Sequence, residues 1–172
     1  MRGISTLASS RQQLRKAPSM QERDELLSMY YFPHHLRLAK EVDAALAMHD
    51  RCLIVDAHSF SSRPLPHEAD QTPDRGDIWV GTDPFHTPLW LADFTVHGFR
   101  NRNCHVEVNR PFGGSLVPEK YHGRDKRVLS IMIEVNRSLY MDEVSGERLA
   151  AFDAVAANIQ QVLLTLIAAM SS

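Results

Sequence analysis

The chain has 172 residues, of which 44% are hydrophobic and 23% charged. This is the composition of one globular domain, and it excludes a mainly disordered or collagen-like chain. Nineteen Lys and Arg residues stand against 21 Asp and Glu residues, for a formal net charge of -2, so binding to a nucleic-acid backbone is not expected. Because no uninterrupted apolar run reaches about 18 residues and no signal sequence is seen, we expect a soluble, cytoplasmic protein.

Capping and periodicity predict the helices. Ser19 with Glu22 three residues later has the spacing of a capping box, which predicts a helix start. Pro33 predicts a break in that helix, because proline lacks an N–H group and clashes with the preceding turn. Apolar residues at helical spacing predict further helices. These are expected at about residues 35–49, 87–102 and 146–170.

Short apolar runs predict the strands. Residues 52–55 and 78–80 read as short buried strands, residues 104–108 alternate between apolar and polar side chains, and residues 128–135 form a longer apolar run. Helices that alternate with strands indicate an α/β fold. Residues 61–76 contain three prolines and many polar side chains, which predicts a long loop of the kind that is often functional.

Polar side chains stand at or just beyond the ends of the predicted strands. The four clusters are Asp56-Ala57-His58-Ser59, Asp83, Asn109-Arg110 and Glu134-Val135-Asn136-Arg137. Ligands of open α/β sheets bind at the carboxyl ends of the strands. A protein that served only as a scaffold would not need several polar clusters at such positions, so they indicate a functional site.

His58 follows a predicted buried strand, and Asp56 stands two residues before it. Neutral imidazole is a common zinc ligand, and a carboxylate often orients its second nitrogen. A histidine that is hydrogen-bonded within the core fits the same pattern. The local sequence leaves both interpretations open.

Glu134 lies inside the apolar run Ile131-Met132-Ile133-Glu134-Val135. A carboxylate rarely enters such a strand without a partner. It is expected either to pair with an arginine or histidine, or to serve as a general base beside a metal ion.

Arg110 and Arg137 each follow an asparagine in the repeated tripeptide Val-Asn-Arg. A guanidinium group binds a carboxylate through two parallel hydrogen bonds, so an arginine near a catalytic carboxylate suits an anionic substrate. A structural ion pair is the alternative, and it explains Arg137 at least as well.

Five stretches taken together resemble the N-formylglutamate amidohydrolase family, distant relatives of the zinc carboxypeptidases. They appear in family order between about residues 29 and 143, and the combination is more specific than any single stretch. The stretches are YYFPHHLRLAKEVDAAL, CLIVDAHSFSSRPLP, DIWVGTDPFHTP, VEVNRPFGGSLVP and SIMIEVNRSLYMDE.

The resemblance implies a three-layer α/β fold in which helices flank a mixed sheet, as in the zinc carboxypeptidases. It implies hydrolysis of N-formyl-L-glutamate, or of a related N-acyl amino acid, to the acid and the free amino acid. In this reading His58 is a zinc ligand and Glu134 is the base that activates the zinc-bound water. Arg110, together with Asn109, would hold a carboxylate of a small acidic substrate.

The sequence departs from the family in one respect. Members of the family carry a further N-terminal segment, with a first strand and a histidine-containing turn that supplies other metal ligands, and only His58 maps cleanly here. We therefore expect a single, N-terminally short domain over residues 1–172. Loss of the first strand would leave an unpaired sheet edge or an exposed apolar face, which self-association would cover. A non-catalytic ligand-binding module, or an inactive fragment of the same fold, is the alternative to a metal-dependent hydrolase. Neither nucleic acid nor a membrane is an expected partner.

Overall fold

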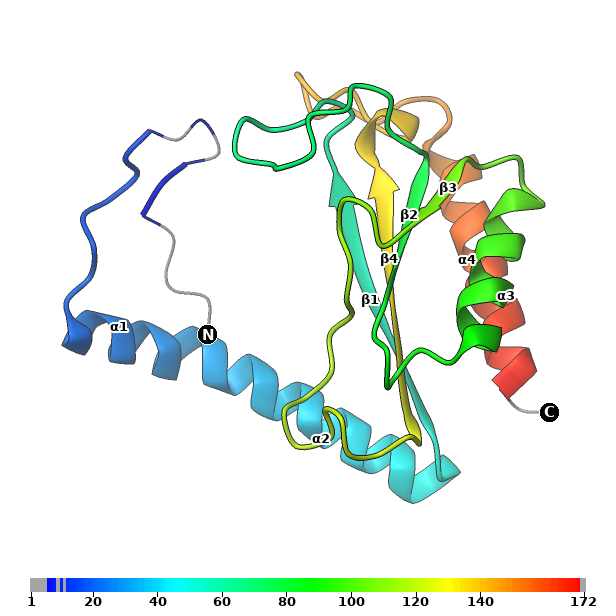
Figure 1. Ribbon diagram of the computed structural model, residues 1–172, viewed down its shortest axis with the longest axis horizontal. Helices are drawn as coiled ribbons and strands as arrows, with labels where there is room; N and C mark the ends of the chain where they lie inside the picture. Colours follow the sequence, from blue (N-terminus) through cyan, green and yellow to red (C-terminus); the bar gives the residue numbers. More distant parts are fainter. Residues whose placement is uncertain (1–5, 9, 11, 171–172) are drawn as a thin grey trace.

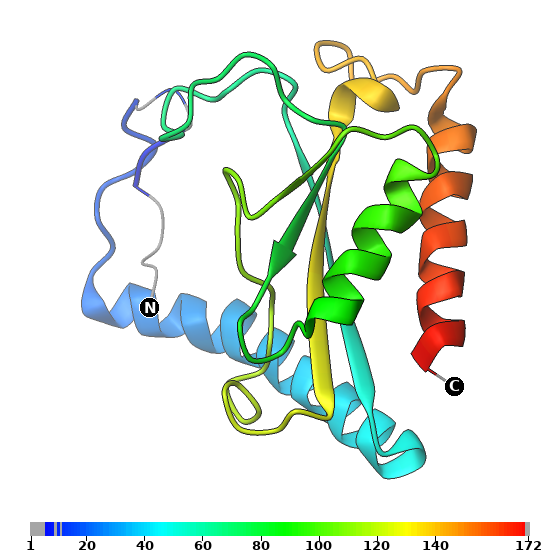
Figure 2. The same cartoon turned by 45° about the vertical axis from the view of Figure 1, so that its right-hand side comes forward.

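The computed structural model describes residues 6–8, 10 and 12–170, which fold around a four-stranded mixed sheet with the strand order β1-β4-β2-β3 (Figure 1). The elements in chain order are α1 (Met20–Leu26), η1 (Leu27–Tyr31), α2 (Phe32–His49), β1 (Cys52–Phe60), β2 (Ile78–Thr82), α3 (Leu89–Arg100), β3 (Val106–Val108), β4 (Val128–Asn136), η2 (Arg137–Leu139) and α4 (Phe152–Met170). Helices α3 and α4 cover one face of the sheet, and α2 crosses the other (Figure 2). The predicted three-layer mixed sheet is confirmed.

The strands run in two directions. β1 and β4 are parallel, β2 and β3 are parallel, and β2 is antiparallel to β4. The carboxyl ends of β2 and β3 therefore lie at the opposite end of the sheet from those of β1 and β4. The four polar clusters therefore follow strand ends at both ends of the sheet, because the strands of this mixed sheet run in both directions.

The long N-terminal helix contains one correction. Ser19 and Glu22 form the expected capping box, in which the Ser19 hydroxyl accepts from the Glu22 N–H and the Glu22 carboxylate accepts from the Ser19 N–H. The break predicted at Pro33 does not occur. Instead, η1 is a π-helical turn in which the Phe32 N–H donates to the Leu27 carbonyl. This wider turn accommodates Pro33 without ending the helix.

The face of the sheet toward α3 and α4 is the main hydrophobic core. It is formed by alternate residues of the central strands and by one stripe of each helix. Its buried members from the sheet are Ile78, Val80, Val106, Ile131, Ile133 and Val135, and those from the helices are Leu91, Val96, Phe99, Val162 and Leu166. A Cβ atom at Gly98 would lie 3.2 Å from the Val162 side chain, so this glycine lets α3 approach α4 closely.

The opposite face of the sheet is divided along the strands. Near the start of β1 and β4 it is apolar, where Ile54 and Val128 pack with Val42 of α2 and with Tyr121. Farther along the same strands it carries polar side chains, beginning at Asp56. β1 extends to Phe60, beyond the predicted end at residue 55, so Asp56 and His58 stand within the strand.

Helix α4 has the length and hydropathy of a membrane-crossing segment. Within the described residues, Val162 and Leu166 of this helix are both 1% exposed in the core against α3 and the sheet, while 11% of its apolar window is buried. Core helices of globular proteins share this composition.

Candidate active site

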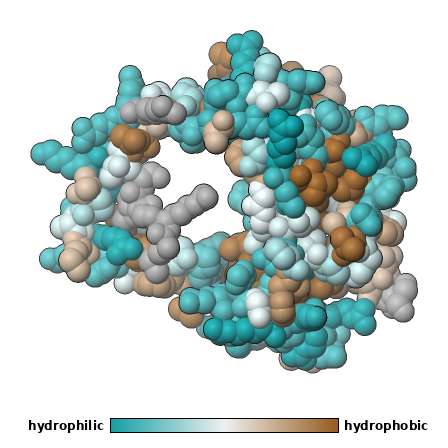
Figure 3. Space-filling model, in the orientation of Figure 1, coloured by the Kyte–Doolittle hydropathy of each residue, from teal (hydrophilic) through white to brown (hydrophobic). Residues whose placement is uncertain are grey.

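One row of side chains crosses all four strands on the open half of the sheet, which is the polar part of the face turned away from α3 and α4. His58 of β1 is paired with Glu134 of β4, Glu134 with Trp79 of β2, and Trp79 with Glu107 of β3. Directly paired residues project from the same face of a sheet. The row therefore brings together two of the predicted residues, His58 and Glu134, and joins to them two residues that sequence analysis did not select. Figure 3 shows an opening on the side of the molecule away from α3 and α4.

His58 is held by Asp56, as its sequence position suggested. The Nε2 atom lies 2.8 Å from Asp56 Oδ1, and the imidazole is half exposed. Asp56 also accepts a hydrogen bond from the Leu116 N–H at 3.1 Å, which fixes the carboxylate that orients the ring. His58 is thus a solvent-facing, oriented imidazole and not a core histidine.

Glu134 is buried, with 9% of its surface exposed. Within the described part of the chain, no hydrogen bond or ion pair engages its carboxylate. Burial raises the pKa of Glu134 above its usual range, and the nearby His58 opposes that rise. A carboxylate that is desolvated, raised in pKa and free of a fixed partner is suited to accept a proton from a reacting group.

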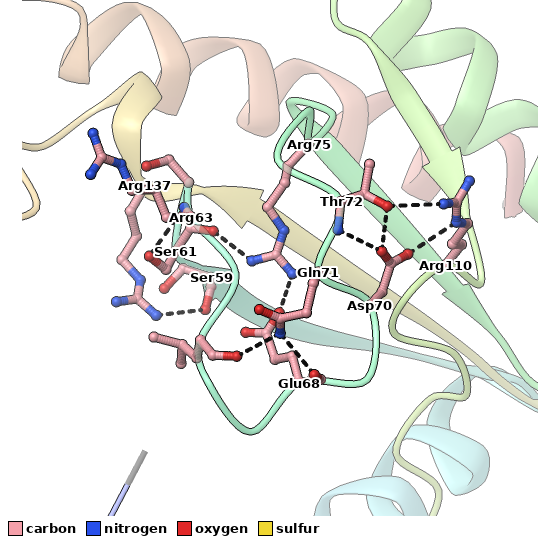
Figure 4. Close-up of polar contacts among 12 residues, drawn as sticks. Ser59, Ser61, Arg63, Glu68, Asp70, Gln71, Thr72, Arg75, Arg110 and Arg137 are labelled. Atoms are coloured by element: carbon pink, nitrogen blue, oxygen red, sulfur yellow. Dashed lines mark hydrogen bonds and ion pairs between the residues drawn. The ribbon is translucent and has the colours of Figure 1, made fainter. Parts of the chain in front are cut away.

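A buried ion pair anchors the loop of residues 61–76 beside this row (Figure 4). The Arg75 guanidinium pairs with the Glu68 carboxylate and donates to the Ser61 carbonyl at 2.8 Å. It also lies 4.7 Å from the centre of the Trp79 ring, which is itself stacked on Phe60 at 3.7 Å. The length and polarity of the loop predicted a functional segment, but nothing local in the sequence marked Arg75 or Glu68 as partners.

Arg110 lies at the β3 end of the row and already has a carboxylate partner. Its Nε donates to Asp70 Oδ2 at 3.1 Å, and its side chain is 63% exposed. Asn109 lies beside Arg110 and contacts the neighbouring strand. Its side chain accepts from the Thr82 N–H at 2.8 Å and donates to the Thr82 hydroxyl at 2.7 Å, which ties the end of β3 to β2.

Two other predicted residues take structural positions. Asp83 lies at the opposite end of the sheet and accepts from the N–H groups of Phe85 and His86, which orders the turn before α3. Arg137 follows β4, and a terminal nitrogen of its guanidinium donates to the Ser59 carbonyl at 3.5 Å. Its positive charge also acts on Glu134, in the direction that opposes the raised pKa.

The sequence model of the N-formylglutamate amidohydrolase family matches residues 2–141. The chain belongs to this family. It is 25% identical over 146 residues to an N-formylglutamate deformylase of Pseudomonas putida, an alignment that covers 74% of this chain and 47% of that relative. The chain thus spans about half the length of this relative.

Two solved structures have the same fold as this member of the N-formylglutamate amidohydrolase family. One is an N-formylglutamate amidohydrolase from Ralstonia eutropha JMP134, with a TM-score of 0.75 and 24% identity, covering 92% of this chain and 58% of that one. The other is a gene product of Agrobacterium tumefaciens, with a TM-score of 0.71 and 19% identity, covering 98% of this chain and 63% of that one.

The described residues do not by themselves complete the zinc site that the family resemblance implies. A catalytic zinc ion takes three protein ligands and keeps one position open. His58 offers an oriented imidazole, but no group of three His, Cys, Asp or Glu side chains in residues 6–8, 10 and 12–170 is arranged to hold a metal ion. Further ligands would have to come from outside this set.

Proposed function

We propose that the protein to which this chain belongs hydrolyses the amide bond of N-formyl-L-glutamate or of a related N-acyl amino acid. Family membership and the shared fold support this reaction class. The observation that carries the proposal is the position of Glu134, a buried carboxylate with a raised pKa that stands beside His58 on the open half of the sheet.

Glu134 and Arg110 have separate roles in the proposed reaction. Glu134 accepts a proton from the attacking water, whose oxygen bonds to the acyl carbon. The tetrahedral adduct collapses as the C–N bond breaks, and the proton held by Glu134 passes to the leaving nitrogen, which gives the carboxylic acid and the free amino acid. Arg110 binds a carboxylate of the substrate at the other end of the row.

The test is the Glu134→Gln variant, assayed by formate release from N-formyl-L-glutamate. We expect kcat/KM to fall by about 100-fold or more, the usual contribution of a general base. The fold should persist, because glutamine keeps the shape and removes a desolvated charge. Glu119→Gln makes the same chemical change at an exposed carboxylate of the same chain and should retain activity. Full activity in Glu134→Gln would overturn the assigned role.

Zinc dependence is a further part of the proposal and is tested on the same protein. Metal content after zinc exposure is measured by mass spectrometry for the wild type and for His58→Ala. Near-stoichiometric zinc that is lost in the variant would support His58 as a ligand. Equal zinc content in the two proteins would rule that role out.

A second candidate is a binding module that does not turn its ligand over. The observation in its favour is that the described residues provide no complete group of three metal ligands. This alternative predicts that the chain binds an N-acyl amino acid through Arg110 and releases no formate. Formate release that depends on Glu134 would exclude it.

A further inference from the structure

A second row of residues lies next to the row of candidate site residues, on the same face of the sheet. It consists of Asp56 of β1, Met132 of β4 and Gly81 of β2, which are paired in register. Each stands two residues from a member of the candidate row, and alternate residues of a strand share a face. Residues 113–117, which we call the strap, cross this second row without forming a helix or strand. The strap therefore borders the candidate site.

The strap lies close to β2 because residue 81 is a glycine. A Cβ atom at Gly81 would overlap the carbonyl oxygen of Gly114. Since this obstacle is backbone and not a flexible side chain, any other residue at position 81 would push this end of the strap away from the sheet.

The hydroxyl of Ser130 holds the other end of the strap. Ser130 lies in β4, is fully buried, and donates from Oγ to the Leu116 carbonyl at 2.8 Å. Its neighbours on this face of the sheet, Ile54 beside it and Val128 two residues earlier, are apolar. A hydroxyl is costly to bury in such a place unless it is hydrogen-bonded. Its partner is the strap.

The backbone of Ser130 is itself fixed. Its N–H donates to the His86 carbonyl at 2.9 Å, and its carbonyl accepts from the Thr87 hydroxyl at 2.5 Å. The hydroxyl therefore starts from a position that the sheet and the turn before α3 already determine.

Asp56 connects the strap to His58. Its Oδ2 accepts from the Leu116 N–H at 3.1 Å, and its Oδ1 lies 2.8 Å from His58 Nε2. A carboxylate only accepts hydrogen bonds, so a neutral His58 carries its proton on Nε2 and keeps the lone pair on its other ring nitrogen. Because the imidazole is half exposed, its direction depends on this contact.

We propose that Ser130 is a positioning residue, which acts through the strap and Asp56 to set the direction of the His58 imidazole. The chain of contacts runs from the Ser130 hydroxyl to Leu116, then to Asp56, and then to the ring. This inference rests on the proposed function, because it accounts for the fixed geometry in which His58 stands beside Glu134.

The first test compares formate release from N-formyl-L-glutamate by the full chain and its variants. In Ser130→Ala we expect kcat to fall about tenfold and KM to stay within about twofold, because groups that orient a site residue contribute about 10- to 100-fold. Ser130→Thr keeps the hydroxyl and should restore most of the lost kcat. The matched control is Thr95→Ala, which should leave kcat unchanged. Thr95 is equally buried and its hydroxyl also donates to a carbonyl at 2.8 Å, but it lies in α3.

The second test follows the same contacts by NMR in chelator-treated chain without substrate. The Leu116 N–H should exchange with solvent about tenfold faster in Ser130→Ala, while amides of the main core keep their rates. At alkaline pH, long-range 1H–15N spectra should show His58 as the Nε2–H tautomer in the wild type and as a mixture of tautomers in Ser130→Ala. Thr95→Ala should show neither change.

Four results would each overturn the proposal. These are an unchanged kcat in Ser130→Ala, an equal loss in Thr95→Ala, no recovery in Ser130→Thr, and a Leu116 amide and His58 tautomer that do not respond. If Ser130→Ala does not fold, Gly81→Ala displaces the strap from its other end and must give the same changes. If the wild type releases no formate, the proposed hydrolysis fails, and the NMR measurements still decide this inference.

Discussion

Strand β4 serves two surfaces that behave differently. Ile131 and Ile133 point toward α3 and α4 and are at most 3% exposed, whereas Glu134, the next residue along, points to the other face and stands in the row with His58. Both faces are buried at this strand, but only the first is closed by two helices. Alternation along one strand therefore separates the core residues Ile131 and Ile133 from the candidate site residue Glu134.

The largest expected effect on stability is in the core between the sheet and helices α3 and α4. Phe99→Ala removes a 0% exposed ring from the core between α3 and the sheet and should lower the free energy of unfolding by about 3–5 kcal/mol. Urea denaturation measures this change. Phe94→Ala on the same helix removes a ring that is 37% exposed and should cost less than half as much. Equal losses would mean that the two faces of α3 are not packed as described.

A smaller loss of stability is expected at the ion pair that anchors the loop of residues 61–76. Glu68→Gln leaves the Arg75 guanidinium, whose side chain is 3% exposed, without its carboxylate, and we expect a loss of about 2–3 kcal/mol. The Ser61 carbonyl and the two aromatic rings still hold the arginine, so the loss stays below that of Phe99→Ala. Urea denaturation again measures it, together with protease cleavage within residues 61–76.

The control for this pair is the double variant Glu68→Gln with Arg75→Met, which removes both charges. It should recover part of the lost stability, since the unpaired buried charge is gone. If the double variant loses the sum of the two single losses, the ion pair does not couple the residues.

The smallest effect on stability concerns Asp125, a partly exposed carboxylate before the start of β4. Hydrogen bonds from Arg127 lower the pKa of Asp125 from 3.8 to about 2. A group whose pKa is lowered in the folded state stabilises the fold above its unfolded pKa, and this contribution is lost as the pH falls from about 4 toward 2. Asp125→Asn should therefore be slightly less stable than the wild type at pH 7 and nearly equal to it at pH 2. Urea midpoints at the two pH values test this, and a constant difference would contradict it.

Local patterns in the sequence were sufficient for much of the fold. The capping box of Ser19 and Glu22 involves residues three apart, so its prediction needed no tertiary information. Alternation and apolar runs located all four strands, although β1 continues past its apolar part to Phe60. Glu134 stood out because a carboxylate inside an apolar strand is unusual. In the structure its side chain is buried, and burial raises its pKa.

Long-range contacts could not be predicted in the same way. Trp79 read only as part of a short strand, because nothing near it in sequence shows that it faces Glu134. Asp70 and Arg110 are 40 residues apart in the chain and meet through a loop whose path depends on Arg75 and Glu68. The contact of Asn109 with Thr82 on a neighbouring strand likewise has no signal in the local sequence.

The amino-acid sequence by itself determined the family and the positions of the helices and strands, and it marked His58 and Glu134 as candidate site residues. These follow from residue types and spacings within a few turns or strand residues. Only the tertiary structure decided that β2 and β3 are antiparallel to β1 and β4, that Asp83 lies away from the row, and that Asp70 pairs with Arg110. Strand direction and register depend on packing between distant segments, which no local pattern contains.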